Sequence, residues 1–114
     1  MIHIINRKSG DESRIPGNIP CIYIGRGRGG VPGNFGNPFS IGCDGTREEV
    51  IEKFRVYFKE RLQNNIAVRA AFNGLVYHAS VGDLYLVCWC APLACHGDVI
   101  RELILAEIAL KTGE

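Results

Sequence analysis

The chain has 114 residues, of which 46% are hydrophobic and 22% are charged, and its formal net charge is +1 at pH 7. This length and composition are typical of one globular domain, which we expect to span residues 1–114. The near-neutral charge excludes a global field that would hold an extended nucleic-acid partner. No apolar run is long enough for a membrane span and no leader segment opens the chain, so we expect a cytoplasmic protein without a membrane partner.

Three short apolar segments are predicted to form strands. They are residues 1–6 (MIHIIN), 21–25 (CIYIG) and 83–90 (DLYLVCWC), each bounded by polar or turn-forming residues. The nearly continuous apolar character of the second segment is typical of a strand that is covered on both faces. Residues 7–20 are polar and contain Gly and Pro, which indicates a loop.

Three other segments are predicted to form helices. Thr46 and Glu49 fit a capping box, and apolar residues at helical spacing continue to about Asn64. Residues 66–79 suit a shorter helix weakened by Gly74, and residues 99–111 suit a last helix. Strands that alternate with helices predict an α/β fold, in the form of a small three-layer Rossmann-like domain with a mostly parallel sheet.

A glycine-rich segment follows the second predicted strand. Its sequence at residues 25–30 is GRGRGG, and the flexible backbone at Gly25 and Gly27 would let amide groups approach a phosphate closely. No Gly-Lys-Ser/Thr follows, so the segment is not a Walker motif. Arg26, at the strand end, suits bidentate contacts to phosphate or carboxylate, whereas Arg28 is expected to be solvated.

Residues 36–39 (GNPF) add an amide and an aromatic ring to this loop. Asn37 precedes Pro38 and is therefore held in an extended or turn conformation, where its amide could read a base or ribose edge. Phe39 could stack on a base. The alternative is an ordinary turn with Phe39 as its buried anchor.

The segment CWCAPLACHGD, at residues 88–98, allows three interpretations. A zinc site would use Cys88, Cys90, Cys95 and His96, although two cysteines two apart on a strand are poorly spaced for one ion. A catalytic site would use Cys90 or Cys95 as nucleophile and His96 as general acid or base. The third interpretation is a packed core, because cysteine is among the most buried residue types.

The same segment also offers ligand-binding groups. Trp89 alternates with its two neighbouring cysteines and would take the other face of the strand, and Gly97 stands at the expected helix start, where amides can hold a phosphate. No acidic pair suited to glycosidic cleavage stands out. Asp44 and Asp98 are the nearest candidates for such a pair, with helix capping as their alternative role. Cys43, in the glycine-rich loop, could approach the motif. If the second and third predicted strands are parallel, both loops emerge at the same sheet edge, where such folds bind ligands.

The segments IYIGRG, GNPFSIG, DGTREEVIEKF and LVCWCAPLACHGDVI together resemble a family of small phage and bacterial proteins with a Cys-Trp-Cys motif, the domain of unknown function 4326. The resemblance extends from about Cys21 to Ala109. It implies no settled activity, and a phage origin would place the protein in the bacterial host's cytoplasm. The positions that it implies to belong to the family's pattern are Arg26, Asn37, Pro38, Cys88, Trp89, Cys90, Pro92, Cys95, His96 and Asp98.

The sequence thus leaves three classes of function open. The first is binding of a nucleotide-type phosphorylated ligand, such as an NAD- or ADP-ribose-derived signal that the protein sequesters. The second is a Cys/His-dependent enzyme that acts on a nucleotide or nucleoside, and the third is a structural zinc or interaction domain. We rank binding first and predict no cofactor and no metal. Tyr57, Tyr77 and Tyr85 are candidates for the interface of a homo-oligomer.

Overall fold

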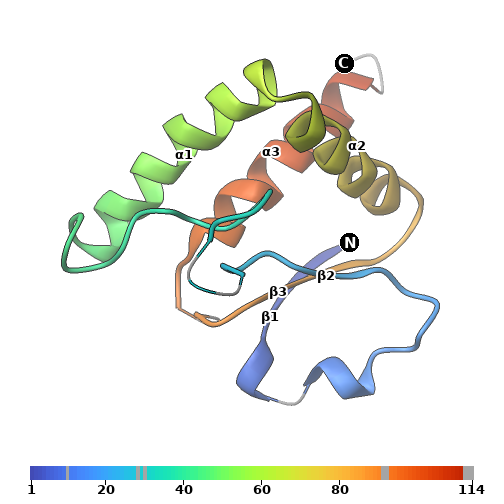
Figure 1. Cartoon of the computed structure of the whole chain (residues 1–114). Helices are drawn as coiled ribbons and strands as arrows, with labels where there is room; N and C mark the ends of the chain where they lie inside the picture. The colour runs from blue at the N-terminus through green and yellow to red at the C-terminus, as the bar shows by residue number, and fades with distance from the viewer. Residues whose placement is uncertain (10, 28, 30, 91–92, 112–114) are drawn as a thin grey trace.

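The computed structural model describes residues 1–9, 11–27, 29, 31–90 and 93–111 (Figure 1). In chain order its strands and α-helices are β1 (Ile2–Asn6), β2 (Cys21–Tyr23), α1 (Arg47–Asn64), α2 (Ile66–Val81), β3 (Leu84–Cys88) and α3 (His96–Lys111). Two 3-10 helices, Arg7–Ser9 and Asp11–Arg14, lie between β1 and β2. Arg28, Gly30 and Pro92, which the sequence analysis singled out, lie outside the described residues.

The strands form one parallel sheet. Its order is β1-β3-β2, and the central Leu86 pairs with Ile4 on one side and with Ile22 on the other. The predicted α/β class and parallel sheet are therefore confirmed. Because all three strands run the same way, the segments that follow Asn6, Tyr23 and Cys88 leave the sheet at one edge.

The three α-helices lie on the same face of the sheet (Figure 1). Alternate strand residues, including Leu84, Leu86 and Cys88, point to that face and are almost fully buried there. On the second face Val87 is buried and the His3 ring stacks on Tyr85, with 4.4 Å between ring centroids. Within the described residues no α-helix lies on that face, so only one of the two helical layers that we expected is present.

The core beneath the helices is one cluster of apolar side chains. Phe54, Phe58 and Phe72 join α1 to α2, with Phe54 stacked on Phe58 at 5.2 Å between centroids. The side chains that α2 and α3 add to the same cluster are Val68, Leu75, Val76, Val99, Ile100 and Ile104. Burial of these groups is the main stabilisation of the fold. No helix in the described part of the chain combines the length and the apolar character needed to cross a bilayer.

Several element boundaries differ from the prediction. β3 ends at Cys88 instead of residue 90, and α3 begins at His96 instead of residue 99. α2 continues to Val81, two residues beyond the prediction. Gly74 within it faces open space, so the absence of a side chain there loses no packing. The capping box of α1 is confirmed, since Thr46 and Glu49 exchange both hydrogen bonds.

Candidate functional site

A pocket of about 380 Å³ lies at the carboxyl edge of the sheet, against the first turns of α1 and the start of α3. It is lined by most of the predicted site residues, namely Gly25, Arg26, Asn37, Phe39, Trp89, Cys90, Cys95 and His96. The predicted residues that do not line it are Gly27, Pro38, Gly97 and Asp98. The two loops singled out in the sequence thus meet around one cavity.

Arg26 fixes the segment of residues 37–40, which forms one wall of the pocket. Its Nε donates to the Asn37 carbonyl at 2.7 Å, and its Nη2 donates to the Phe39 carbonyl at 2.9 Å and to the Ser40 hydroxyl at 3.1 Å. Charge-assisted hydrogen bonds of this kind are stronger than neutral ones. The predicted anion-binding arginine therefore uses most of its donors to fix the loop at residues 37–40.

Asn37 is also engaged within the protein. Its Oδ1 accepts from the Phe39 amide at 2.9 Å, which closes a local turn, and its Nδ2 donates to the Val50 carbonyl in α1 at 3.3 Å. The ring of Phe39 meets Tyr57 edge-on, with 6.0 Å between centroids. The turn with an aromatic anchor, which we gave as the alternative, accounts for these contacts. Both side chains still border the cavity.

Tyr23 and Trp89 form the outer wall. Trp89 Nε1 donates to the Tyr23 hydroxyl at 2.8 Å, and that hydroxyl donates to the Arg26 carbonyl at 2.8 Å. Gly25 makes this arrangement possible, because a Cβ at that position would lie 2.4 Å from the Tyr23 hydroxyl oxygen. Trp89 is 48% exposed, so much of its ring is open to a partner. Lys8 Nζ lies 5.7 Å from the centroid of that ring.

Arg47 is a lining residue that the sequence analysis missed. It is the first residue of α1, and its Nη1 donates to the Ala94 carbonyl at 2.9 Å, which ties α1 to the segment before α3. Among the described residues its Nε and Nη2 have no hydrogen-bond partner. An arginine in the first turn of a helix gives no signal of its own in a single sequence, since the charge there is usually solvated. Tyr23, Ser40, Ile41, Val50, Ile51 and Ala94 complete the lining.

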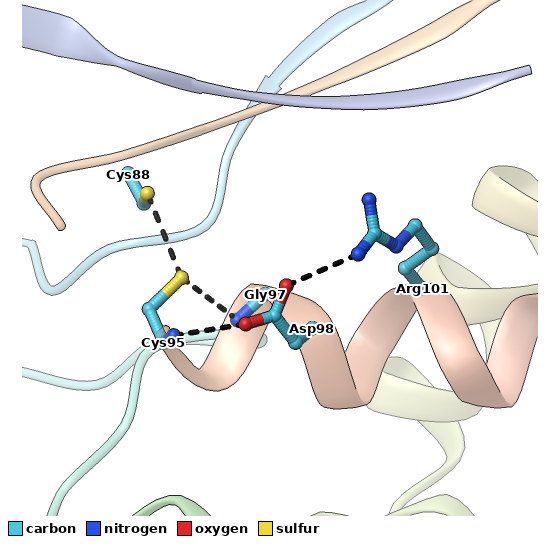
Figure 2. Close-up of polar contacts among 5 residues, drawn as sticks. All are labelled: Cys88, Cys95, Gly97, Asp98 and Arg101. Atoms are coloured by element: carbon cyan, nitrogen blue, oxygen red, sulfur yellow. Dashed lines mark hydrogen bonds and ion pairs between the residues drawn. The ribbon is translucent and has the colours of Figure 1, made fainter. Parts of the chain in front are cut away.

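Cys95 caps the N-terminus of α3, as Figure 2 shows. Its sulfur accepts from the Gly97 amide at 3.3 Å, and the Asp98 carboxylate accepts from the Cys95 amide at 3.1 Å. The arrangement resembles a capping box, with a thiol in the place of the usual hydroxyl and with the second helical amide bound instead of the third. The chain's own groups therefore occupy the helix start that was predicted to hold phosphate. Gly97 is buried there, and a Cβ added to it would lie 2.9 Å from Ile24 Cδ1.

The thiols of the motif differ in environment. Cys95 donates to the Cys88 sulfur at 3.7 Å, and this hydrogen bond together with burial raises the pKa of the Cys95 thiol far above its usual range. A nucleophilic cysteine needs the opposite shift. Cys90 is only partly buried and lines the pocket, so it suits the catalytic hypothesis better than Cys95. Cys43 is exposed.

His96 is the most buried polar side chain of the site. It is 8% exposed, its Nε2 lies 2.6 Å from the Ile24 carbonyl oxygen, and its ring meets Phe54 edge-on. Burial lowers the pKa of His96, and the carbonyl of Ile24 opposes that shift in part. The imidazole is therefore neutral near pH 7. Among the described residues, no group of three or more His, Cys, Asp or Glu side chains is arranged to hold a metal ion.

The comparisons with known proteins identify a family. The family model described as Domain of unknown function (DUF4326) matches residues 5–106. The match covers most of the chain, so the chain belongs to this family. No curated protein and no solved structure matches it.

Proposed function

We propose that this member of the DUF4326 family binds a nucleotide-type phosphorylated ligand in the pocket at the carboxyl edge of its sheet. The observation that carries the proposal is the pairing, around one cavity, of an arginine, two of whose nitrogens are bound by none of the described residues, with an exposed indole ring. Arg47 would hold the phosphate, and Trp89 would stack on the base or pack against the ribose. NAD- and ADP-ribose-derived signals are the candidates for the natural ligand, which the protein would sequester.

The position of the pocket supports this proposal. Open parallel sheets bind ligands outside the carboxyl ends of their strands, and the pocket lies there. Its volume of about 380 Å³ is at the small end of the range for ligand sites, roughly 300–1,000 Å³. This size favours a mononucleotide-sized group over a whole dinucleotide.

A second candidate is a Cys/His-dependent enzyme that acts on a nucleotide or nucleoside. The observation in its favour is that Cys90 and His96 line the same pocket. It predicts that the ligand is consumed, and that Cys90→Ser stops turnover but retains binding. Chromatography of a nucleotide incubated with the protein separates this candidate from pure binding.

Isothermal titration calorimetry tests the proposed function. We expect saturable binding of ADP, the group shared by NAD and ADP-ribose, and much weaker binding of adenosine, which lacks phosphate. Arg47→Ala should weaken ADP binding by about tenfold, since a hydrogen bond to a charged group contributes roughly 1.5–3 kcal/mol.

Lys59→Ala is the matched control for Arg47→Ala. Lys59 lies in the same helix, is exposed and does not line the pocket, so its removal changes the net charge equally. ADP affinity should be unchanged in this variant. No heat signal for ADP, NAD, ADP-ribose or GDP at millimolar concentration would contradict the proposal, as would equal losses in the two variants.

A further inference from the structure

The thiols of Cys88 and Cys95 point toward each other at one side of the pocket (Figure 2). Their sulfur atoms lie 3.7 Å apart, although the two residues are seven positions apart in the sequence. A disulfide bond is about 2.05 Å long, so the sulfurs need to approach by roughly 1.6 Å to form one. The end of β3 and the start of α3 thus bring together a pair of thiols within reach of oxidation.

Each cysteine of this pair adjoins a group that the proposed function uses. Cys88 is followed directly by Trp89, whose ring would stack on the base. Cys95 follows Ala94, whose carbonyl accepts a hydrogen bond from Arg47 at 2.9 Å. A change in the spacing of the two sulfurs therefore acts on both the indole ring and the guanidinium that would hold the nucleotide.

We infer that Cys88 and Cys95 are a redox switch of the nucleotide pocket, in which oxidation of the pair to a disulfide weakens ligand binding and reduction restores it. This inference rests on the proposed function and adds its regulation. The oxidant is a low-molecular-weight disulfide such as glutathione disulfide. The two protein thiols lose two protons and two electrons and form one S–S bond, while the S–S bond of the oxidant breaks and yields two thiols.

Cys90 provides the route to the buried pair. Its side chain is only partly buried, lines the pocket, and packs against the core cluster that contains Cys88 and Cys95. The oxidant first forms a mixed disulfide with Cys90 and releases one thiol. Cys95 then attacks the Cys90 sulfur and releases the second thiol, and Cys88 attacks the Cys95 sulfur and returns Cys90 to its thiol form. In each step the attacking thiol loses its proton and the leaving sulfur gains one.

The disulfide should disturb the start of α3. In the reduced form Cys95 Sγ accepts from the Gly97 amide at 3.3 Å, and Cys88 occupies the last position of β3. Approach of the two sulfurs therefore strains the Gly97 hydrogen bond and displaces the neighbouring Ala94. Since Arg47 donates to the Ala94 carbonyl, we expect ADP to bind about tenfold more weakly to the oxidised protein.

Calorimetry with ADP on the reduced and the oxidised protein tests this switch. The protein is equilibrated in glutathione buffers of increasing potential, and peptide mass spectrometry without reductant identifies the disulfide. We expect a Cys88–Cys95 disulfide, ADP affinity lower by about tenfold, and recovery after treatment with dithiothreitol. Because the coupling is reciprocal, saturating ADP should raise the reduction potential of the disulfide by about 30 mV, which corresponds to the same tenfold factor.

Variants separate the pair from the other thiols. Cys88→Ser cannot form the disulfide but keeps an acceptor for the Cys95 thiol, so its ADP affinity should not respond to glutathione disulfide. Cys43→Ser is the matched control, because it removes an exposed thiol outside the pair and should keep the full response. Cys90→Ser should form the same disulfide more slowly. The melting temperature of each variant shows whether it is folded.

The outcomes distinguish this inference from the proposed function. If the wild-type protein forms no Cys88–Cys95 disulfide, or if both forms bind ADP equally, the inference is wrong and the proposed function stands. A loss of affinity on oxidation that persists in Cys88→Ser also contradicts the inference. If the reduced protein binds neither ADP nor the other nucleotides, the proposed function itself is wrong.

Discussion

The sulfur atoms of Cys95 and Cys88 lie 3.7 Å apart, where the start of α3 meets the end of β3 (Figure 2). Both side chains are buried, and Cys95 also accepts from the Gly97 amide. The pair thus fixes the helix to the strand next to Cys90 and His96, which line the pocket. Cys95 itself also lines the pocket, and its contacts and raised pKa favour a structural role for this thiol.

The capping role of Cys95 can be measured as stability. Cys95→Ala removes the acceptor for the Gly97 amide and should lower the free energy of unfolding by about 1 kcal/mol or more, the usual cost of losing an N-cap. Cys95→Ser supplies a hydroxyl that can accept from the same amide and should be the more stable of the two variants. Urea unfolding measures both, and an Ala variant as stable as the Ser variant would disprove the cap.

Alkylation should discriminate among the cysteines. The raised pKa of Cys95 keeps its thiol protonated at pH 7, and burial shields both Cys95 and Cys88. Iodoacetamide should therefore modify the exposed Cys43 first and this pair last, as followed by peptide mass spectrometry. Early modification of Cys95 in the folded protein would show that its environment is not the one described.

We expect the hydrogen bonds of Arg26 to residues 37–40 to contribute more to stability than its positive charge does. Arg26→Lys keeps the positive charge but cannot reproduce the three hydrogen bonds to residues 37–40, so we expect a loss of about 2 kcal/mol in the free energy of unfolding. Arg69→Lys is the control, because Arg69 forms a partly exposed ion pair with Glu107. Such pairs contribute little, so the control should stay within about 0.5 kcal/mol of wild type.

Trp89 provides an optical signal for the pocket, since it is the only tryptophan of the chain. Tyr23→Phe removes the hydroxyl that accepts from the indole nitrogen, and should shift the emission maximum of the free protein. A ligand that stacks on Trp89 should quench its fluorescence with the same dissociation constant that calorimetry gives. Binding without any change in fluorescence would place the ligand away from this wall.

Stability should depend on pH through His96. Burial lowers the pKa of His96 in the folded protein below the ordinary value of 6.5, so the unfolded chain binds the proton more readily. The free energy of unfolding should therefore be highest above pH 6.5 and decline as the pH falls below it. His96→Gln should remove most of this decline, and His78→Gln should keep it, when urea midpoints are compared between pH 5 and 8.

The sheet and the meeting of the two loops could be predicted because they follow from local patterns. The apolar strand segments and the capping box at Thr46 are local signals. Parallel strands then bring their carboxyl ends together whatever the loops contain. The order β1-β3-β2 and the single helical layer depend on long-range packing that one sequence does not reveal.

The roles of individual site residues were harder to predict than their location. Arg26 and Asn37 were expected to face a ligand, and both line the pocket, yet both also make hydrogen bonds within their own loop. A long loop in a small domain must satisfy its backbone polar groups in this way. Gly97 and Asp98 were expected at the ligand but belong to the cap of α3. Arg47 was missed because its hydrogen bond to the Ala94 carbonyl joins two segments that lie far apart in the sequence.

The measurement that tests the account most directly is an amide NMR titration of the ¹⁵N-labelled protein with ADP. We predict saturable shifts at Gly25, Arg47 and Cys90, which come from three separate segments and meet only at the pocket. The groove between α2 and α3 around Tyr77 should be unaffected. Absence of saturable shifts, or shifts confined to that groove, would contradict the claim that this pocket binds nucleotides.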